Sequence, residues 1–143
     1  MNKNIYYLLL PRFFMLNFKC DMYPAELENI EDVILKIKQE PALMLYFYSD
    51  HCAPCLSLRP KVIELVQKEF PRVSMYLVNS EKHPEIAAAH HCFSNPTLIL
   101  YFDSREYRRM SKYVSISQLS GEILRPYELM FGDYQEARQR LGF

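Results

Sequence analysis

Two cysteines three positions apart are the residues best suited to chemistry in this sequence. Cys52 and Cys55 stand in the stretch YFYSDHCAPCLSLRP, residues 46–60. A pair of thiols at this spacing can hold a metal ion, form a structural disulfide, or exchange electrons with other proteins. The chain has four cysteines in 143 residues, too few for a disulfide scaffold. The lone C-x-x-C therefore points to redox or metal chemistry.

The segments before and just after the cysteine pair show clear periodicity. Four apolar residues recur at helical spacing and predict a helix with one buried stripe: Ile30, Val33, Ile34 and Ile37. Asn29 is placed to cap the start of that helix. The apolar run ALMLYFY, residues 42–48, is too short for a helix and predicts a strand buried on both faces. A second helix follows the cysteines, and four residues line its buried face: Leu58, Val62, Val66 and Phe70.

The alternation of strands and helices continues to the end of the domain. We predict strands at 73–79 and 97–102, an edge strand at 106–114, and helices at 83–91 and 115–131. The basic residues of the edge strand are expected to protect that edge. Gly132 closes the last helix, and a short helix from Asp133 follows it. This order predicts an α/β sandwich around a mixed sheet, with the last two strands antiparallel.

The cysteine pair falls where a buried strand passes into a helix. The free N–H groups and partial positive charge of a helix N-terminus favour a thiolate, so we expect Cys52 to be the exposed, attacking thiol. Pro54 suits the first helical turn, where no backbone donor is needed. Cys55 lies one turn further along, where it can attack a mixed disulfide and release the product.

These residues resemble the thioredoxin family over about residues 26–131. Pro60 follows Cys55 by five positions, and Pro96 precedes Thr97 and the apolar strand LILYF. The resemblance implies a thioredoxin-like sandwich in which Asn95–Pro96 is a cis peptide bond beside Cys52. It also implies a thiol–disulfide oxidoreductase that reduces protein disulfides, uses no cofactor, and is recharged by a reductase.

The same resemblance assigns roles to individual residues. Cys52 and Cys55 would be catalytic. Four residues would support the active site: His51, Ala53, Pro54 and Pro96. Asn95 and Thr97 would belong to the substrate groove.

Several positions depart from the family pattern. His51 stands where the family has a tryptophan, and when protonated it would stabilise the Cys52 thiolate. Tyr46 and Leu77 occupy the positions of a buried acid and a lysine that help to deprotonate the second thiol. Their replacement puts rapid, general reduction of protein disulfides in question. Asn95 replaces an aliphatic residue and should alter substrate preference.

Two other functions stay open on the sequence alone. A zinc site would draw its ligands from five residues: Cys52, Cys55, His90, His91 and Cys92. Alternatively, the domain would be a thioredoxin-like module that binds peptides without turnover. Cys92 is read either as a small core residue or as a regulatory thiol near the Pro96 loop, and Cys20 as an incidental free thiol.

The ends of the chain and its charge set further expectations. We divide the chain into an apolar extension (1–25), the domain (26–131) and a helical tail (132–143). The apolar residues 5–18 are split by proline and arginine, so we expect them to pack on the domain or on a second copy, making a homodimer, rather than to span a membrane. Formal net charge is zero, so nucleic acid is not an expected partner. We expect a cytoplasmic protein; export remains an alternative.

Overall fold

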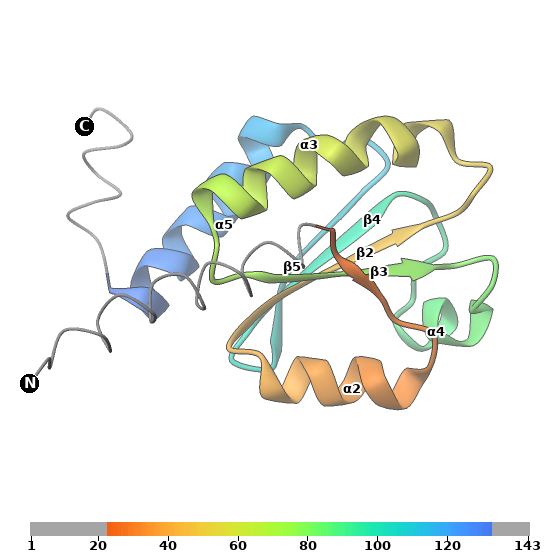
Figure 1. Cartoon of the computed structure of the whole chain (residues 1–143), viewed down its shortest axis with the longest axis horizontal. Coiled ribbons are helices and arrows are strands. Elements are labelled where there is room, and N and C mark those ends of the chain that lie inside the picture. The colour runs from red at the N-terminus through yellow and green to blue at the C-terminus, as the bar shows by residue number, and fades with distance from the viewer. Residues whose placement is uncertain (1–22, 133–143) are drawn as a thin grey trace, which may run out of the picture.

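A computed structural model describes residues 23–132 of the chain as one five-stranded sheet with helices on both faces (Figure 1). The strands are β1 (Ala25–Glu26), β2 (Ala42–Tyr48), β3 (Ser74–Asn79), β4 (Thr97–Phe102) and β5 (Arg105–Ser111). The helices are α2 (Ile30–Gln39), α3 (Ala53–Glu69), α4 (Pro84–Ala89) and α5 (Ile116–Phe131). The α/β fold expected from the sequence is therefore confirmed.

The sheet is mixed, and its strands run in the order β1-β3-β2-β4-β5. β2 pairs in parallel with β3 and antiparallel with β4, while β5 pairs antiparallel with β4 at the edge of the sheet. The β4–β5 hairpin turns through Asp103 and Ser104, whose φ angles are 51° and 61°. Two consecutive left-handed residues match the twist of a tight hairpin, although glycine or asparagine is the usual choice there.

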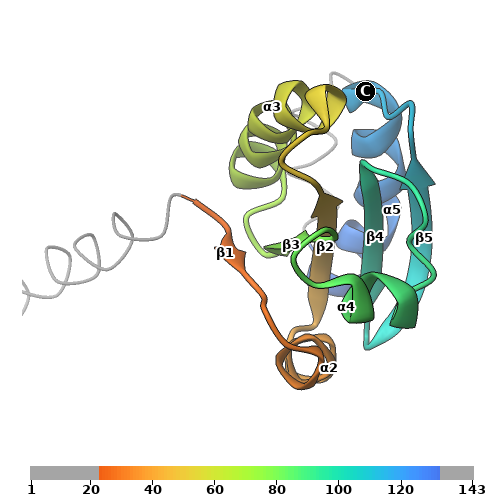
Figure 2. The same cartoon turned by 90° about the vertical axis from the view of Figure 1, so that its right-hand side faces the viewer.

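Two helical layers enclose the sheet and divide the core in two. Figures 1 and 2 show α3 and α5 against one face and α2 and α4 against the other. Side chains of β2 alternate between these layers: Tyr46 packs in the α3–α5 layer, and its neighbour Phe47 packs in the α2–α4 layer. All seven residues of β2 are buried, as its uninterrupted apolar run predicts.

Three details of the sequence prediction are wrong. Ile34 is 44% exposed, because the buried stripe of α2 follows Ile30, Val33 and Ile37 and leaves Ile34 beside it. The two-residue strand β1, which pairs with β3, was not predicted. The edge strand ends at Ser111 rather than at residue 114, so Lys112 lies beyond it.

The predicted helix ends are confirmed at both α2 and α5. The side chain of Asn29 accepts a hydrogen bond from the backbone N–H of Asp32 (2.8 Å) and so caps the first turn of α2. Gly132 ends α5 with φ 78°, a left-handed conformation that a residue without Cβ adopts at little cost.

Other sequence predictions fall outside the described residues. They concern the apolar segment 5–18, Cys20 and the helix from Asp133, and the three-part division of the chain stays a prediction. Within residues 23–132, none of the helices combines the length and the apolar character that a bilayer crossing requires.

Candidate active site: the dithiol at the start of α3

The two cysteines of the C-x-x-C are joined in a disulfide at the first turn of α3. Their Cα atoms lie 5.3 Å apart, within the range that a disulfide requires. Cys52 is the N-cap of the helix, and its Sγ accepts a hydrogen bond from the backbone N–H of Cys55 (3.2 Å). Cys52 is partly exposed, whereas Cys55 is 0% exposed. The predicted difference in exposure between the two thiols is therefore confirmed.

The local sequence explains why a helix begins at this point. β2 ends at Tyr48, and the backbone N–H of Cys52 donates to the carbonyl of Ser49 (3.3 Å), which turns the chain. Pro54 occupies the first turn of α3, where its missing N–H leaves no helical bond unmade. Pro60 lies inside the helix, as the sequence predicts.

Tyr46 lies beneath the dithiol and is fully buried. Its hydroxyl donates a hydrogen bond to the carbonyl oxygen of Cys55 (2.8 Å). Burial raises the pKa of Tyr46 to about 12, although the charge of Arg59 acts in the opposite direction. The hydroxyl is therefore protonated at neutral pH and serves as a donor. Leu77, which pairs with Tyr46 in the parallel register of β2 and β3, adds no charge.

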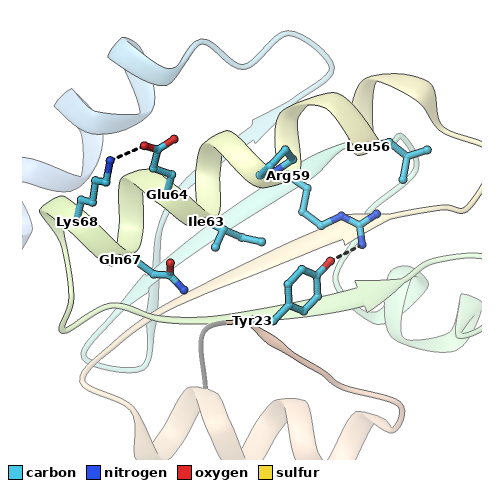
Figure 3. Close-up of a pocket in the computed structure, with 8 residues that line it drawn as sticks. Tyr23, Leu56, Arg59, Ile63, Glu64, Gln67 and Lys68 are labelled. Carbon is cyan, nitrogen blue, oxygen red and sulfur yellow. Dashed lines mark hydrogen bonds and ion pairs between the residues drawn. The ribbon is translucent and has the colours of Figure 1, made fainter. Parts of the chain in front are cut away.

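Arg59 lies on the side of α3 that faces β1 (Figure 3). Its Nη1 donates to the hydroxyl of Tyr23 (3.1 Å), and its guanidinium carbon lies 4.3 Å from the ring centroid of Tyr48. The Tyr48 hydroxyl in turn donates to Glu26 (2.8 Å), which ties β1 to β2. A hollow of about 520 Å³ lies along this flank of the helix, lined by Tyr23, Leu56 and Arg59 among others.

His51 stands on the β3 side of the dithiol and is turned toward a carboxylate. Its Nδ1 lies 3.1 Å from Oε2 of Glu81, and its side chain is 87% exposed. The nearby Asp50 accepts a hydrogen bond from Nδ2 of Asn79 (3.2 Å) and lies 3.8 Å from the ammonium of Lys82. The contact that the structure shows for His51 is thus to Glu81, and the expected support of the Cys52 thiolate stays a prediction.

A groove of about 390 Å³ lies on the opposite, α5 side of the dithiol. Pro54 of the C-x-x-C and Pro96 both line it, and the Asn95–Pro96 peptide bond is cis. Asn95 does not line this groove; its Oδ1 accepts a hydrogen bond from the hydroxyl of Ser80 (3.1 Å). Thr97 is 2% exposed, and its hydroxyl donates to the carbonyl of Ser94 (2.6 Å). That Asn95 and Thr97 belong to the substrate groove stays a prediction.

Sequence reasoning missed the charged and aromatic residues of this groove. Lys61 of α3 lines it, together with Lys112 and Tyr113 from the link between β5 and α5. Lys112 was read as protection of the sheet edge, but the strand ends one residue before it. The position of Lys112 and Tyr113, directly after an edge strand and shortly before a helix, is the signal that could have identified them.

Cys92 lies in the other layer of the core, away from the dithiol. It packs with residues of α2 and α4. Burial raises the pKa of the Cys92 thiol to about 11, with the nearby Arg109 lowering it in part. A buried thiol that keeps its proton fits the reading of Cys92 as a core residue.

The structure brings no set of metal ligands together in residues 23–132. No group of three or more histidine, cysteine or acidic side chains lies close enough to hold a metal ion in that part of the chain. His90 instead has its Nδ1 3.0 Å from the carbonyl of Ile86 and its ring against Phe47. The zinc ligands proposed from the sequence are thus split, with Cys92 in the α2–α4 layer and the dithiol on the other side of the sheet.

Comparisons with known proteins point to one family. Residues 22–124 match the family model described as Thioredoxin. The thioredoxin-like protein YdfQ of Bacillus subtilis is 28% identical over 97 residues, which cover 68% of this chain and 86% of that protein. The thioredoxin of Chlamydia caviae is 35% identical over 68 residues, 48% of this chain and 66% of that protein.

Solved structures agree in fold. Fasciola hepatica thioredoxin superposes with a TM-score of 0.61 at 26% identity, covering 72% of this chain and 98% of that one. The oxidised form of mitochondrial thioredoxin 3 from Saccharomyces cerevisiae gives a TM-score of 0.64 at 24% identity, covering 68% and 92%.

Proposed function

Because the chain belongs to the thioredoxin family, we propose that Cys52 and Cys55 are the two residues through which it exchanges disulfides with other proteins. The protein is a thiol–disulfide oxidoreductase. The observation that carries the assignment of roles is the difference between the two sulfurs. Cys52 is accessible at a helix N-terminus, and Cys55 is buried within bonding distance of it.

The exchange begins from the reduced dithiol. The Cys52 thiolate attacks one sulfur of the substrate disulfide; a Cys52–substrate bond forms, the substrate S–S bond breaks, and the first substrate thiolate leaves. Cys55 then gives up its proton and attacks Sγ of Cys52. The Cys52–Cys55 disulfide forms and the second substrate thiolate leaves. Two electrons pass to the substrate, and its two thiolates take up the two protons released by the dithiol.

The geometry around Cys52 supports its role as the attacking thiol. The backbone N–H of Cys55 points at Sγ of Cys52, and the partial positive charge of the α3 N-terminus favours the thiolate there. The hydrogen bond from Tyr46 fixes the backbone of Cys55, so the second sulfur stays one helical turn from the first.

The direction of electron flow and the partners belong to the same proposal. We infer a reductant of protein disulfides that a separate reductase recharges, as is general in the family. A cytoplasmic setting accords with this role, because the cytosol keeps thiols reduced. The reduction potential tests the direction: a value near −270 mV fits a reductant, whereas one near −120 mV fits an oxidant.

Two single substitutions test the roles of the thiols. Cys52→Ser should abolish exchange, whereas Cys55→Ser should accumulate a mixed disulfide with the substrate, visible as a non-reducing gel band or by mass. Cys92→Ser is the matched control and should retain wild-type exchange. Equal and substantial turnover by both active-site variants would contradict this assignment. Binding of a disulfide-free partner by the Cys52/Cys55 double variant, with no turnover by the wild type, would favour the peptide-binding alternative.

A further inference from the structure

The two sides of the dithiol differ in charge: the β3 side holds charges of both signs in pairs, and the α5 side holds positive charges only. On the β3 side, two carboxylates, Glu81 and Asp50, lie beside His51 and Lys82. On the α5 side, the charged residues that line the Pro96 groove are both lysines, Lys61 and Lys112.

These two lysines have no partner that would neutralise them in the described part of the chain. No ion pair within residues 23–132 includes either lysine, and both are exposed. The whole chain has 17 basic and 17 acidic residues and no formal net charge. The positive charge of the groove is therefore a local feature rather than a reflection of overall composition.

The backbone holds Lys112 at the groove in an unusual conformation. Its φ angle is 64°, a left-handed value that residues with a Cβ rarely adopt. Its N–H donates to the carbonyl of Pro96 (3.0 Å), which ties the link between β5 and α5 to the Pro96 loop. Non-glycine residues held in such conformations cluster at functional sites. Next to it, the ring of Tyr113 is 94% exposed and lines the same groove.

We propose that the groove between Pro96, Lys61 and Lys112 selects protein substrates that carry acidic side chains beside the disulfide to be reduced. The proposal rests on the proposed function, because it assigns the substrate class of the same dithiol. An extended segment entering the groove from Cys52 passes Pro54 and Pro96 and presents alternate side chains toward the lysines. Carboxylates at those positions meet two ammonium groups, while Tyr113 offers an apolar face to the segment.

Matched peptides separate selection by substrate charge from the disulfide exchange reaction itself. The substrates are three disulfide-linked peptides of the same length. They differ only in the two residues beside the cysteine, which are both Glu, both Gln or both Lys. Exchange is followed with wild-type protein and with Lys61→Gln, Lys112→Gln and the double variant. Lys38→Gln is the control, because Lys38 is an exposed lysine of α2, on the opposite face of the sheet.

The wild-type protein should favour the Glu peptide over the Gln peptide in kcat/KM, with the Lys peptide slowest. Each lysine variant should lose about twofold to fivefold with the Glu peptide, as expected for exposed charge pairs, and keep its rate with the Gln peptide. Raising the salt from 0.05 to 0.5 M should narrow the wild-type preference, since the Debye length falls well below 10 Å. Lys61→Glu should abolish the preference, because one lysine then faces one glutamate, and the Lys61→Glu/Lys112→Glu double variant should reverse the order of the charged peptides; an unchanged order in that double variant would overturn the proposal.

The outcomes distinguish this inference from the function on which it rests. Equal wild-type rates for the Glu and Gln peptides, or a preference that survives in the double variant, would overturn the charge selection and leave the oxidoreductase activity standing. The wild-type preference for a small anionic disulfide over a small neutral one could also equal the preference for the Glu peptide over the Gln peptide. That result would overturn the proposal, because the groove would then not be recognising a protein segment. Failure of wild-type protein to exchange even the Gln peptide would overturn both.

Discussion

Replacing Tyr46 by phenylalanine tests what the hydroxyl beneath the dithiol contributes. The substitution removes one oxygen and keeps the ring that fills the α3–α5 layer. The atom lost is the donor of the 2.8 Å hydrogen bond to the Cys55 carbonyl. Because Tyr46 is fully buried, no bulk water can replace this donor.

The expected loss of stability follows from the burial of Tyr46 and from the one hydrogen bond that the substitution removes. A typical intramolecular hydrogen bond contributes about 0.5–1.5 kcal/mol net, so Tyr46→Phe should lower the free energy of unfolding by about 1 kcal/mol. That loss corresponds to a fall in Tm of roughly 3–6 °C for a domain of this size. Exchange activity should change little at neutral pH, because a phenol with a pKa of about 12 is not a proton acceptor there.

Urea unfolding of the oxidised protein, followed by circular dichroism, gives the stability change at constant m-value. Tyr113→Phe is the control, because its ring is exposed and its loss of the same atom should shift stability by less than about 0.5 kcal/mol. Equal midpoints for Tyr46→Phe and wild type would refute the contribution of the hydrogen bond. A fall in exchange rate of more than about tenfold, with the fold intact, would refute the purely structural role given to the hydroxyl.

The remaining predictions concern Arg109, Asn29 and Cys92. Arg109→Gln removes the 2.6 Å hydrogen bond from Nη1 to the carbonyl of His90 and should lower the free energy of unfolding by about 1–2 kcal/mol in urea; an unchanged midpoint would contradict this. Asn29→Ala removes the cap of α2 and should cost about 1 kcal/mol, whereas Asn29→Ser should recover most of it. Oxidised Cys20→Ser protein leaves Cys92 as the thiol that a reagent can label. At pH 8 the thiolate fraction of Cys92 should be about 100-fold lower in the folded protein than in the unfolded chain, and labelling should be slower in proportion. Labelling of the folded protein at the rate of the unfolded chain would contradict the burial of Cys92. Because folding raises this pKa from 9.0 to about 11, the associated stability is full below pH 9 and is lost as pH rises to about 11; Cys92→Ala should flatten that part of the stability curve.

The sequence predicted the elements whose signals are local and strong. The apolar run 42–48 coincides with β2, Asn29 caps the start of α2, and Gly132 ends α5, as expected. β1 was not predicted, because its two exposed residues, Ala25 and Glu26, are too few to show a hydrophobic periodicity. Their pairing with β3 depends on tertiary contacts.

The site was predictable where chemistry depends on sequence spacing. The dithiol at a strand-to-helix junction follows from neighbouring residues alone. The hydrogen bond from Tyr46 to Cys55 was not predictable, because it requires the depth at which β2 passes under α3. The place of Lys112 in the groove likewise depends on where β5 ends and how the chain then turns toward α5.

The division of the core by the sheet has a consequence for how substitutions combine. Val62 of α3 and Ile123 of α5 pack in one layer, whereas Ile86 of α4 packs in the other. Free-energy changes at distant sites without shared neighbours add, and changes at neighbours do not. Because Val62 and Ile123 belong to one packed cluster, truncating both should show a coupling energy, whereas Val62 and Ile86 should behave independently. We therefore expect that substitutions in the half of the core that supports the dithiol need no compensating change on the far side of the sheet.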